Sequence, residues 1–257
     1  MNGKKIYFAS DLHLGIATST PSIEREKLFV RWLEMARHDA SEIFLLGDIF
    51  DFWHEYRYVI PKGFSRFQGA IASITDSGIP VHFFTGNHDL WMYGYLAQEL
   101  GVTIHTQPLV TELYGKKFFL GHGDGLGSGD TGYKLMKRAF SSPSLQWLFA
   151  RLHPNFAMWI GTKWSTSSRY SKAITHVFRG EEELITRFVR KHATIDPAHF
   201  YIFGHWHSPV VYPLNEQCTL VLLGDWVENY TYGVWDAERF SLFRYHSDGS
   251  VERVREG

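Results

Sequence analysis

The sequence predicts an α/β fold in which buried strands alternate with helices and then give way to a series of strands. Short apolar runs are typical of strands buried on both faces, and helix-like segments separate the first three of them. After residue 195 the sequence becomes mostly strand-like. Strand–helix–strand order predicts a parallel core with right-handed crossovers, and the later strands are compatible with a second sheet packed on the first.

Five of the predicted strands share one form, an apolar or aromatic run that stops at polar residues. In chain order they read KIYFASDLH, EIFLLGDIFD, PVHFFTGNHD, KKFFLGHGD and HFYIFGHWH. Helices are predicted over residues 22–39, with Ser22 as N-cap, and over residues 63–78, where Gly78 suits a C-cap. The Asp-Gly pair at 248–249 predicts a hairpin turn between the last strands.

Composition indicates an ordinary globular protein, which we expect to form one domain over residues 1–257. Lys and Arg number 26 against 27 Asp and Glu, so the overall charge gives no support to nucleic-acid binding. The single cysteine, Cys218, cannot form an internal disulfide, which favours a reducing compartment. No signal-peptide core and no apolar run of about 20 residues is found, so we expect a soluble or peripheral protein.

Potential metal ligands follow every one of the five runs. They are Asp11 and His13; Asp48 and Asp51; Asn87, His88 and Asp89; His122 and Asp124; and His205 and His207. Because ligand sites of open α/β sheets lie beyond the carboxyl ends of the strands, these side chains are expected to converge. So many carboxylates would repel one another and lose hydration, and a pair of divalent cations removes that cost.

The donor types narrow the choice of metal and of chemistry. Imidazoles mixed with carboxylate and amide oxygens, without thiolates, favour Mn²⁺, Fe or Zn²⁺. Asp48 is the simplest bridge between two ions, which would lie about 3.5–4 Å apart and activate water against a phosphorus centre. One Gly-Asp pair after a strand is usually just a turn, but five such breaks in order favour metal binding over structural turns.

The ordered motifs DLH, GDIFD, GNHD, GHGD and GHWH resemble those of the calcineurin-like metallophosphoesterase superfamily. This resemblance implies a β-sandwich flanked by helices and a dinuclear site. It implies one metal held by Asp11, His13, Asp48 and His207, and a second held by Asp48, Asn87, His122 and His205. It also implies that His88 lies beside the leaving group or phosphate, oriented by Asp89, so that Asp48, Asn87 and His88 are the expected catalytic residues.

Residues 131–180 form a segment of a different character, predicted to be a helical cap inserted into the domain. It contains eight Lys or Arg residues and no Asp or Glu, together with Trp147, Trp159 and Trp164. A basic, aromatic-rich helical segment fits an anionic membrane surface or an amphiphilic phosphate. A helical insertion that only packs on the core, with incidental charges, is the alternative.

Within the superfamily the layout is similar to the UDP-2,3-diacylglucosamine diphosphatases of lipid A biosynthesis, which carry an apolar helical cap after the fourth motif. Their His-Gly-Asp, Asp and Tyr pattern is matched by His122, Gly123, Asp124, Asp130 and Tyr133. The resemblance implies attack of water on the α-phosphorus of the UDP moiety, which releases UMP and 2,3-diacylglucosamine 1-phosphate. It implies substrate contacts from Asn87, His88, Asp130, Tyr133, Ser168, Lys172 and His205.

Two positions depart from that family's pattern. His88 replaces its common arginine, and GDGLGSG between His122 and Asp130 lacks its usual Cys-Thr-Asp. The preferred interpretation is an enzyme with two Mn²⁺ ions, cytoplasmic and peripheral on the inner face of the inner membrane. A soluble phosphodiesterase or phosphomonoesterase of the same fold and a non-catalytic, metal-free binding module are the alternatives.

Overall fold

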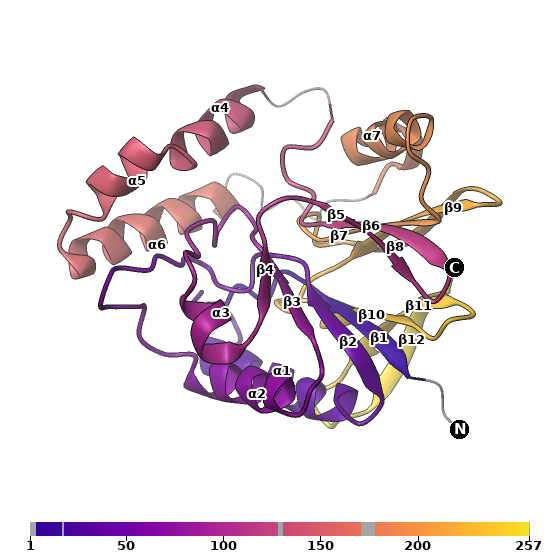
Figure 1. Cartoon of the computed structure of the whole chain (residues 1–257), viewed down its shortest axis with the longest axis horizontal. Coiled ribbons are helices and arrows are strands. Elements are labelled where there is room, and N and C mark those ends of the chain that lie inside the picture. The colour runs from indigo at the N-terminus through magenta and orange to yellow at the C-terminus, as the bar shows by residue number, and fades with distance from the viewer. Residues whose placement is uncertain (1–3, 17, 128–130, 171–177, 257) are drawn as a thin grey trace.

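Two β-sheets packed face to face form the centre of the molecule (Figure 1). The computed structural model describes residues 4–16, 18–127, 131–170 and 178–256, and only the backbone of 166–170 and 256. The first sheet has the order β12 (Val251–Glu256), β11 (Phe240–Tyr245), β10 (Thr231–Trp235), β1 (Lys5–Ala9), β2 (Ala40–Leu45), β3 (Val81–Phe84), β4 (Thr103–His105). The second has the order β5 (Leu109–Leu113), β6 (Lys116–Gly121), β7 (Phe200–Phe203), β9 (Cys218–Leu223), β8 (Pro209–Asn215).

The predicted parallel core is confirmed. β1 to β4 run parallel to one another, and so do β6, β7 and β9 in the second sheet. The predicted hairpin joins β11 and β12, with Gly249 at φ +87° in its turn. The strands after residue 195 do not all belong to the second sheet, because β10 pairs antiparallel with β1 and extends the first sheet.

Helices cover the outer faces of both sheets. α1 (Ser22–Ala36), α2 (Ser65–Asp76) and α3 (Tyr95–Leu100) pack on the first sheet, and η1 (Gly180–Glu182) leads into α7 (Leu184–Ala193) on the second (Figure 1). The expectation that Ser22 caps α1 was wrong: the helix begins at Ser22 itself, whose Oγ accepts a hydrogen bond from the Gly15 amide, 2.7 Å away. Gly78, at φ +85°, follows α2 as expected of a C-cap glycine.

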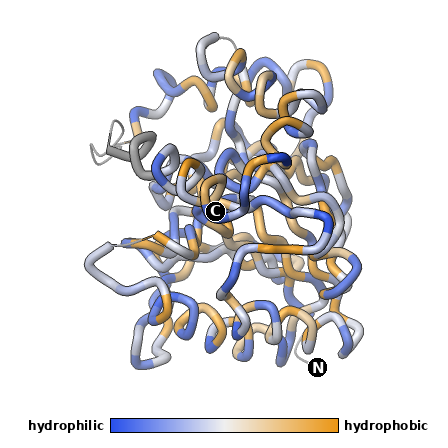
Figure 2. The backbone as a smooth tube through the Cα atoms, turned by 90° about the vertical axis from the view of Figure 1, so that its left-hand side faces the viewer, coloured by the Kyte–Doolittle hydropathy of each residue, from blue (hydrophilic) through white to orange (hydrophobic). Residues whose placement is uncertain are grey.

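Apolar side chains alternate between the layers, which explains the continuous hydrophobic runs in the sequence. Along β1, Ile6 and Phe8 point between the sheets, while Tyr7 and Ala9 point to the helices. The rings of Phe8 and Phe118 stack at 6.1 Å across the sandwich. Figure 2 shows hydrophobic residues along the central strands and alternation with hydrophilic ones along the helices. This packing holds the strand ends, and with them the site, in place.

Three further helices run through the segment predicted as a helical insertion. α4 (Thr131–Phe140), α5 (Pro143–Phe149) and α6 (Pro154–Tyr170) lie together beyond one end of the sandwich (Figure 1). α4 and α5 bury none of their side chains. On α6, by contrast, Ala157 and Ser165 are fully buried. All three helices contact the rest of the molecule: Phe140 of α4 and Phe149 of α5 pack on Trp91, and Gly161 of α6 lies against Phe52.

Candidate metal centre and active site

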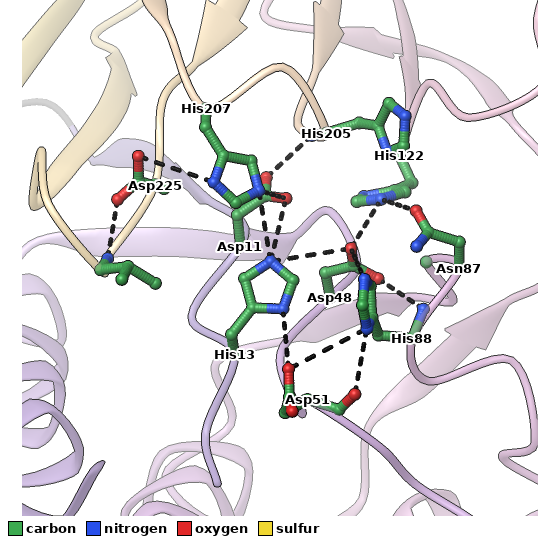
Figure 3. A network of polar contacts seen from close by, with 12 residues as sticks. Asp11, His13, Asp48, Asp51, Asn87, His88, His122, His205, His207 and Asp225 are labelled. Atoms are coloured by element: carbon green, nitrogen blue, oxygen red, sulfur yellow. Dashed lines mark hydrogen bonds and ion pairs between the residues drawn. The ribbon is translucent and has the colours of Figure 1, made fainter. Parts of the chain in front are cut away.

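The five motif loops converge at the carboxyl ends of β1, β2, β3, β6 and β7, as the strand pattern predicted (Figure 3). In one group, Nε2 of His207 lies 3.2 Å from Nε2 of His13 and 3.2 Å from Oδ1 of Asp11. Donor atoms of these three residues lie within 4.8 Å of one another. That separation suits ligands of one ion.

A second group lies directly beside the first. Nε2 of His122 lies 3.2 Å from Oδ2 of Asp48 and 3.3 Å from Oδ1 of Asn87, and His205 joins His122 and Asp48 within 4.8 Å. Oδ2 of Asp48 is also 3.8 Å from Nε2 of His13, a member of the first group. The structure thus brings together all seven predicted ligands, with Asp48 between the two groups in the place of a bridge.

Asp51 and His88 form a third cluster with His13. It lies on the Nδ1 side of the His13 ring, whereas His207 lies on the Nε2 side. Oδ1 of Asp51 lies 3.6 Å from Nδ1 of His13, and its backbone carbonyl lies 3.1 Å from Nδ1 of His88. Nε2 of His88 lies 4.0 Å from Oδ2 of Asp48. A carboxylate behind a metal-binding imidazole orients the ring and raises its basicity, a role that suits Asp51.

The backbone of this site is strained. Five of the predicted ligands have a positive φ angle: Asp11 (+56°), His13 (+45°), Asp48 (+52°), His205 (+68°) and His207 (+51°). They are five of the nine non-glycine residues with positive φ in the described parts of the chain. Such conformations cost about 1–3 kcal/mol each and persist only where the surroundings enforce them, which is typical of functional sites.

Glycines let neighbouring loops approach the ligands. A Cβ atom at Gly86 would stand 2.2 Å from Oδ1 of Asp48, and one at Gly204 would stand 2.4 Å from Oδ2 of Asp11. Real Cβ contacts of that length do not occur. The glycines at positions 86 and 204 are therefore a packing requirement of the site itself.

Replacement of Gly86 by alanine should damage the site. Because the added methyl group also meets the Asp48 backbone nitrogen at 2.5 Å, we expect a loss of about 1–3 kcal/mol in unfolding free energy. Manganese affinity should fall more than about tenfold. Gly69→Ala on the exposed side of α2, where no atom lies within 4 Å, is the matched control and should stabilise by about 0.5–1 kcal/mol. Equal metal affinity in both variants would contradict this assignment.

Asp89 ties two of the loops together instead of orienting His88, the role that the resemblance implied. Its carboxylate accepts hydrogen bonds from the amides of Gly86, Ile49, Phe50 and Asp48, at 2.7–3.3 Å. Burial, reinforced by the charge of Asp48, raises the pKa of Asp89 to about 7. Asp89 therefore fixes the loop that carries Asp48 against the loop that carries Asn87.

The buried carboxylate of Asp48 requires positive charge beside it. Burial opposes ionisation of Asp48, but the charges of His122 and His88 outweigh it and hold the pKa of Asp48 well below its usual value. Burial likewise opposes protonation of His122, yet the charge of Asp48 raises the pKa of His122 to about 10. In the metal-free chain a proton on His122 thus neutralises the carboxylate that a cation would otherwise neutralise.

Metal loading should consequently release protons. With a pKa of about 10, His122 is protonated at pH 8 in the metal-free chain, and a ligand imidazole must lose that proton. Affinity for Mn²⁺ is therefore expected to rise with pH between 6 and 9. Calorimetric titrations in two buffers of different ionisation enthalpy count the released protons. Affinity independent of pH, with no proton released, would be inconsistent with this arrangement.

Asp225 is a site residue that the sequence analysis missed. It follows β9, and its Oδ2 lies 3.9 Å from Nδ1 of His207. Its carboxylate also accepts hydrogen bonds from the amides of Val227 and Glu228. The signal was present in the sequence, because VLLGD has the same apolar run, glycine and aspartate as the five motifs. Asp225 stands behind His207 as Asp51 stands behind His13.

The predicted substrate-contacting residues are only partly placed. Asn87, His88 and His205 lie in the site (Figure 3). The Tyr133 hydroxyl donates a hydrogen bond to Oδ2 of Asp124, and its ring centroid lies 6.4 Å from that of His205. Asp130 and Lys172 lie outside the described residues, and for Ser168 only the backbone, in α6, is described.

Comparison with known families decides what kind of site this is. The sequence model of the calcineurin-like phosphoesterases matches residues 4–209, which contain all five motifs. The chain belongs to the calcineurin-like phosphoesterase family. The chain presents two adjoining groups of mostly buried imidazole and carboxylate donors, a donor set that fits divalent transition-metal ions.

Curated relatives within this phosphoesterase family match nearly the whole chain. A Porphyromonas gingivalis protein named UDP-2,3-diacylglucosamine hydrolase is 40% identical over 252 residues, which cover 93% of this chain and 96% of that protein. Proteins of the same name from Escherichia coli and Histophilus somni are 32% and 29% identical. They cover 85% and 87% of this chain, and 90% and 92% of their own lengths.

Proposed function

We propose that this phosphoesterase is a metal-dependent hydrolase that cleaves the diphosphate of UDP-2,3-diacylglucosamine, yielding UMP and 2,3-diacylglucosamine 1-phosphate in lipid A biosynthesis. The observation that carries the proposal is a complete double donor site in a chain that is 40% identical, over 93% of its length, to a protein named as that hydrolase. The presence of all seven donors argues against a metal-free binding module.

The two donor groups support our assignment of the metal ligands. Asp11, His13, Asp48 and His207 would hold one ion, and Asp48, Asn87, His122 and His205 the other; Mn²⁺ is our choice among the ions that such donors bind. Divalent ions bound in this way lower the pKa of a coordinated water and neutralise phosphate oxygens. The chain itself supplies the fixed geometry, through Asp89 and Asp225 behind the ligands.

His88 is the residue best placed to act on the phosphate or the leaving group. Its Nε2 faces Asp48, and its backbone amide donates a hydrogen bond to Oδ1 of Asp48, 2.9 Å away. The leaving group of the proposed reaction is itself a phosphate, whose second pKa of about 6 means that it needs little protonation. The principal role of His88 in this reaction is then to bind and neutralise the phosphate.

The helices α4–α6 are proposed to bind the acyl chains and to face an anionic membrane. Six large apolar side chains on them are exposed: Leu135, Leu145, Trp147, Leu148, Phe156 and Trp159. Two of them make cation–π contacts with basic side chains. Arg151 lies over the Trp147 ring, 4.3 Å from its centroid, and Lys163 lies over the Trp159 ring, 4.7 Å from its centroid. Paired aromatic and basic side chains suit the interface of an anionic bilayer.

Within the described residues, no helix has the length and apolar character needed to cross a membrane. Separately, the exposed aromatic and basic side chains of α4–α6 support our proposal of a peripheral protein on the cytoplasmic face of the inner membrane. The predicted absence of a nucleic-acid partner stays a prediction.

The proposal is tested by comparing two substrates with the Mn²⁺-loaded protein. UDP-2,3-diacylglucosamine should be hydrolysed to UMP, and UDP-N-acetylglucosamine, which lacks the acyl chains, should be turned over at least about 10²-fold less efficiently, because the apolar chains contribute several kcal/mol of binding. Equal efficiencies would leave α4–α6 without a role in recognition. No hydrolysis of the acylated compound by fully loaded protein would refute the proposal.

One observation favours a second function. His88 stands where the diacylglucosamine diphosphatases commonly carry arginine, and an imidazole is a better proton donor than a guanidinium. A phosphodiesterase or phosphomonoesterase with an alcohol leaving group needs such an acid more than a diphosphatase does. Faster turnover of small phosphate esters than of UDP-2,3-diacylglucosamine would favour this alternative.

A further inference from the structure

One helix of the segment between β6 and β7 touches the reaction centre directly. Ser165 of α6 is fully buried, and its Oγ lies 2.9 Å from Nδ1 of His88. The two residues are 77 positions apart in the chain. The side chain of Trp164 lies beside them, with its ring centroid 6.0 Å from that of His88. α6 thus supplies a hydrogen-bonding partner to the histidine that faces Asp48.

The partners of His88 determine which nitrogen carries the proton. The carbonyl oxygen of Asp51, 3.1 Å from Nδ1, can only accept a hydrogen bond, so Nδ1 carries the hydrogen. Ser165 Oγ is then a second acceptor for the same N–H group. Because Asp51 and Ser165 both bond to Nδ1, Nε2 is the ring nitrogen that faces Asp48, 4.0 Å from its Oδ2.

The face of α6 that carries Ser165 is built for close approach to the core. Ala157, Gly161 and Ser165 are spaced four residues apart, so they share one side of the helix, and all three are buried. A Cβ atom at Gly161 would meet the Phe52 ring at 2.3 Å, so the α6 backbone lies directly against that ring. Any added bulk at position 161 must lift α6 or displace Phe52.

We propose that Ser165 is a positioning residue that fixes the His88 imidazole only while α6 is seated on the core. In the structure α6 is already seated against Phe52, so the helix presents Ser165 to His88 before the phosphate binds. This inference rests on the proposed function, because it assumes that the reacting phosphate lies between His88 and the metal ligands. It gives the predicted cap a second task beside holding the acyl chains.

Steady-state kinetics on UDP-2,3-diacylglucosamine with Mn²⁺-loaded protein test the proposal. Ser165→Ala should lower kcat about tenfold, as loss of a supporting hydrogen bond typically does, with KM and metal content unchanged. When Ser165→Ala is added to His88→Ala, kcat should fall no further, because both substitutions remove the same function of His88. Gly161→Ala should reproduce the loss in kcat by lifting α6. Ser144→Ala, an exposed serine of α5, is the matched control and should behave as wild type.

A raised KM with unchanged kcat would overturn the proposal, because it would mean that Ser165 contacts substrate instead of positioning His88. Losses that multiply in the double variant would overturn it as well. Imidazole ¹⁵N spectra of Mg²⁺-loaded protein give a readout independent of activity. Because the Asp51 carbonyl keeps Nδ1 protonated in both proteins, His88 should show an Nδ1–H form in each, with an Nδ1 signal that is shifted and broadened in Ser165→Ala by loss of the Ser165 hydrogen bond. Identical spectra would refute the positioning role, whereas inactive wild-type protein with the expected spectra would refute only the proposed substrate.

Discussion

Asp48→Asn is expected to lower kcat at least about 10³-fold, because the metals contribute several kcal/mol of transition-state stabilisation and each 1.36 kcal/mol is a factor of ten. Oδ2 of Asp48 lies 3.2 Å from Nε2 of His122 and 3.8 Å from Nε2 of His13, so it is shared by both donor groups. Its Oδ1 also accepts the His88 amide. An amide in its place supplies a single neutral acceptor and leaves both groups short of negative charge.

Metal analysis of the same protein separates this effect from misfolding. Asp48→Asn should bind fewer than two ions per chain after exposure to excess Mn²⁺, while retaining the far-ultraviolet circular dichroism of the wild type. Asp76→Asn, an exposed carboxylate at the end of α2, is the matched control and should keep both ions and full activity. Two bound ions and a kcat within tenfold of wild type in Asp48→Asn would remove Asp48 from the centre of the site.

His88→Ala is expected to lower kcat on UDP-2,3-diacylglucosamine about 10²-fold, the lower end of what a positioned proton donor or phosphate ligand contributes. The imidazole is buried and its Nε2 faces Asp48 at 4.0 Å. A phosphate leaving group needs little protonation, so most of the loss reflects weaker neutralisation of the phosphate.

The measurement is kcat at saturating substrate for His88→Ala, with metal content checked alongside. His38→Ala, an exposed histidine just before β2, provides the matched control and should leave kcat unchanged. A loss near 10⁴-fold would instead indicate general-acid catalysis of an alkoxide leaving group and favour the alternative function. An unchanged kcat would exclude His88 from the reaction.

Much of the site was predictable because its ligands are tied to strand ends. A buried strand leaves a strong apolar signal, and the residue after it is forced to the sheet edge where loops meet. Asp11, Asp48 and His122 each follow such a run, and the structure brings them together. Asp225 follows the same kind of run in β9, so its position at the site was equally predictable from the sequence.

Other features depend on tertiary contacts that leave no local pattern. Ser165 lies in STSSRYSK, where nothing distinguishes one serine from the next, and its partner His88 is 77 residues away. The addition of β10 to the first sheet depends on its register with β1, in which Tyr7 pairs with Val234. The role of Asp89 was likewise hidden, because its partners are backbone amides of another loop.

The central claim is that two cations bind side by side with Asp48 between them. The most direct test is an anomalous difference map from crystals of this protein grown with Mn²⁺. We expect two peaks about 3.5–4 Å apart, one beside Asp11 and His207 and the other beside His122 and His205. A single peak, or a pair of peaks that does not flank Asp48, would contradict it.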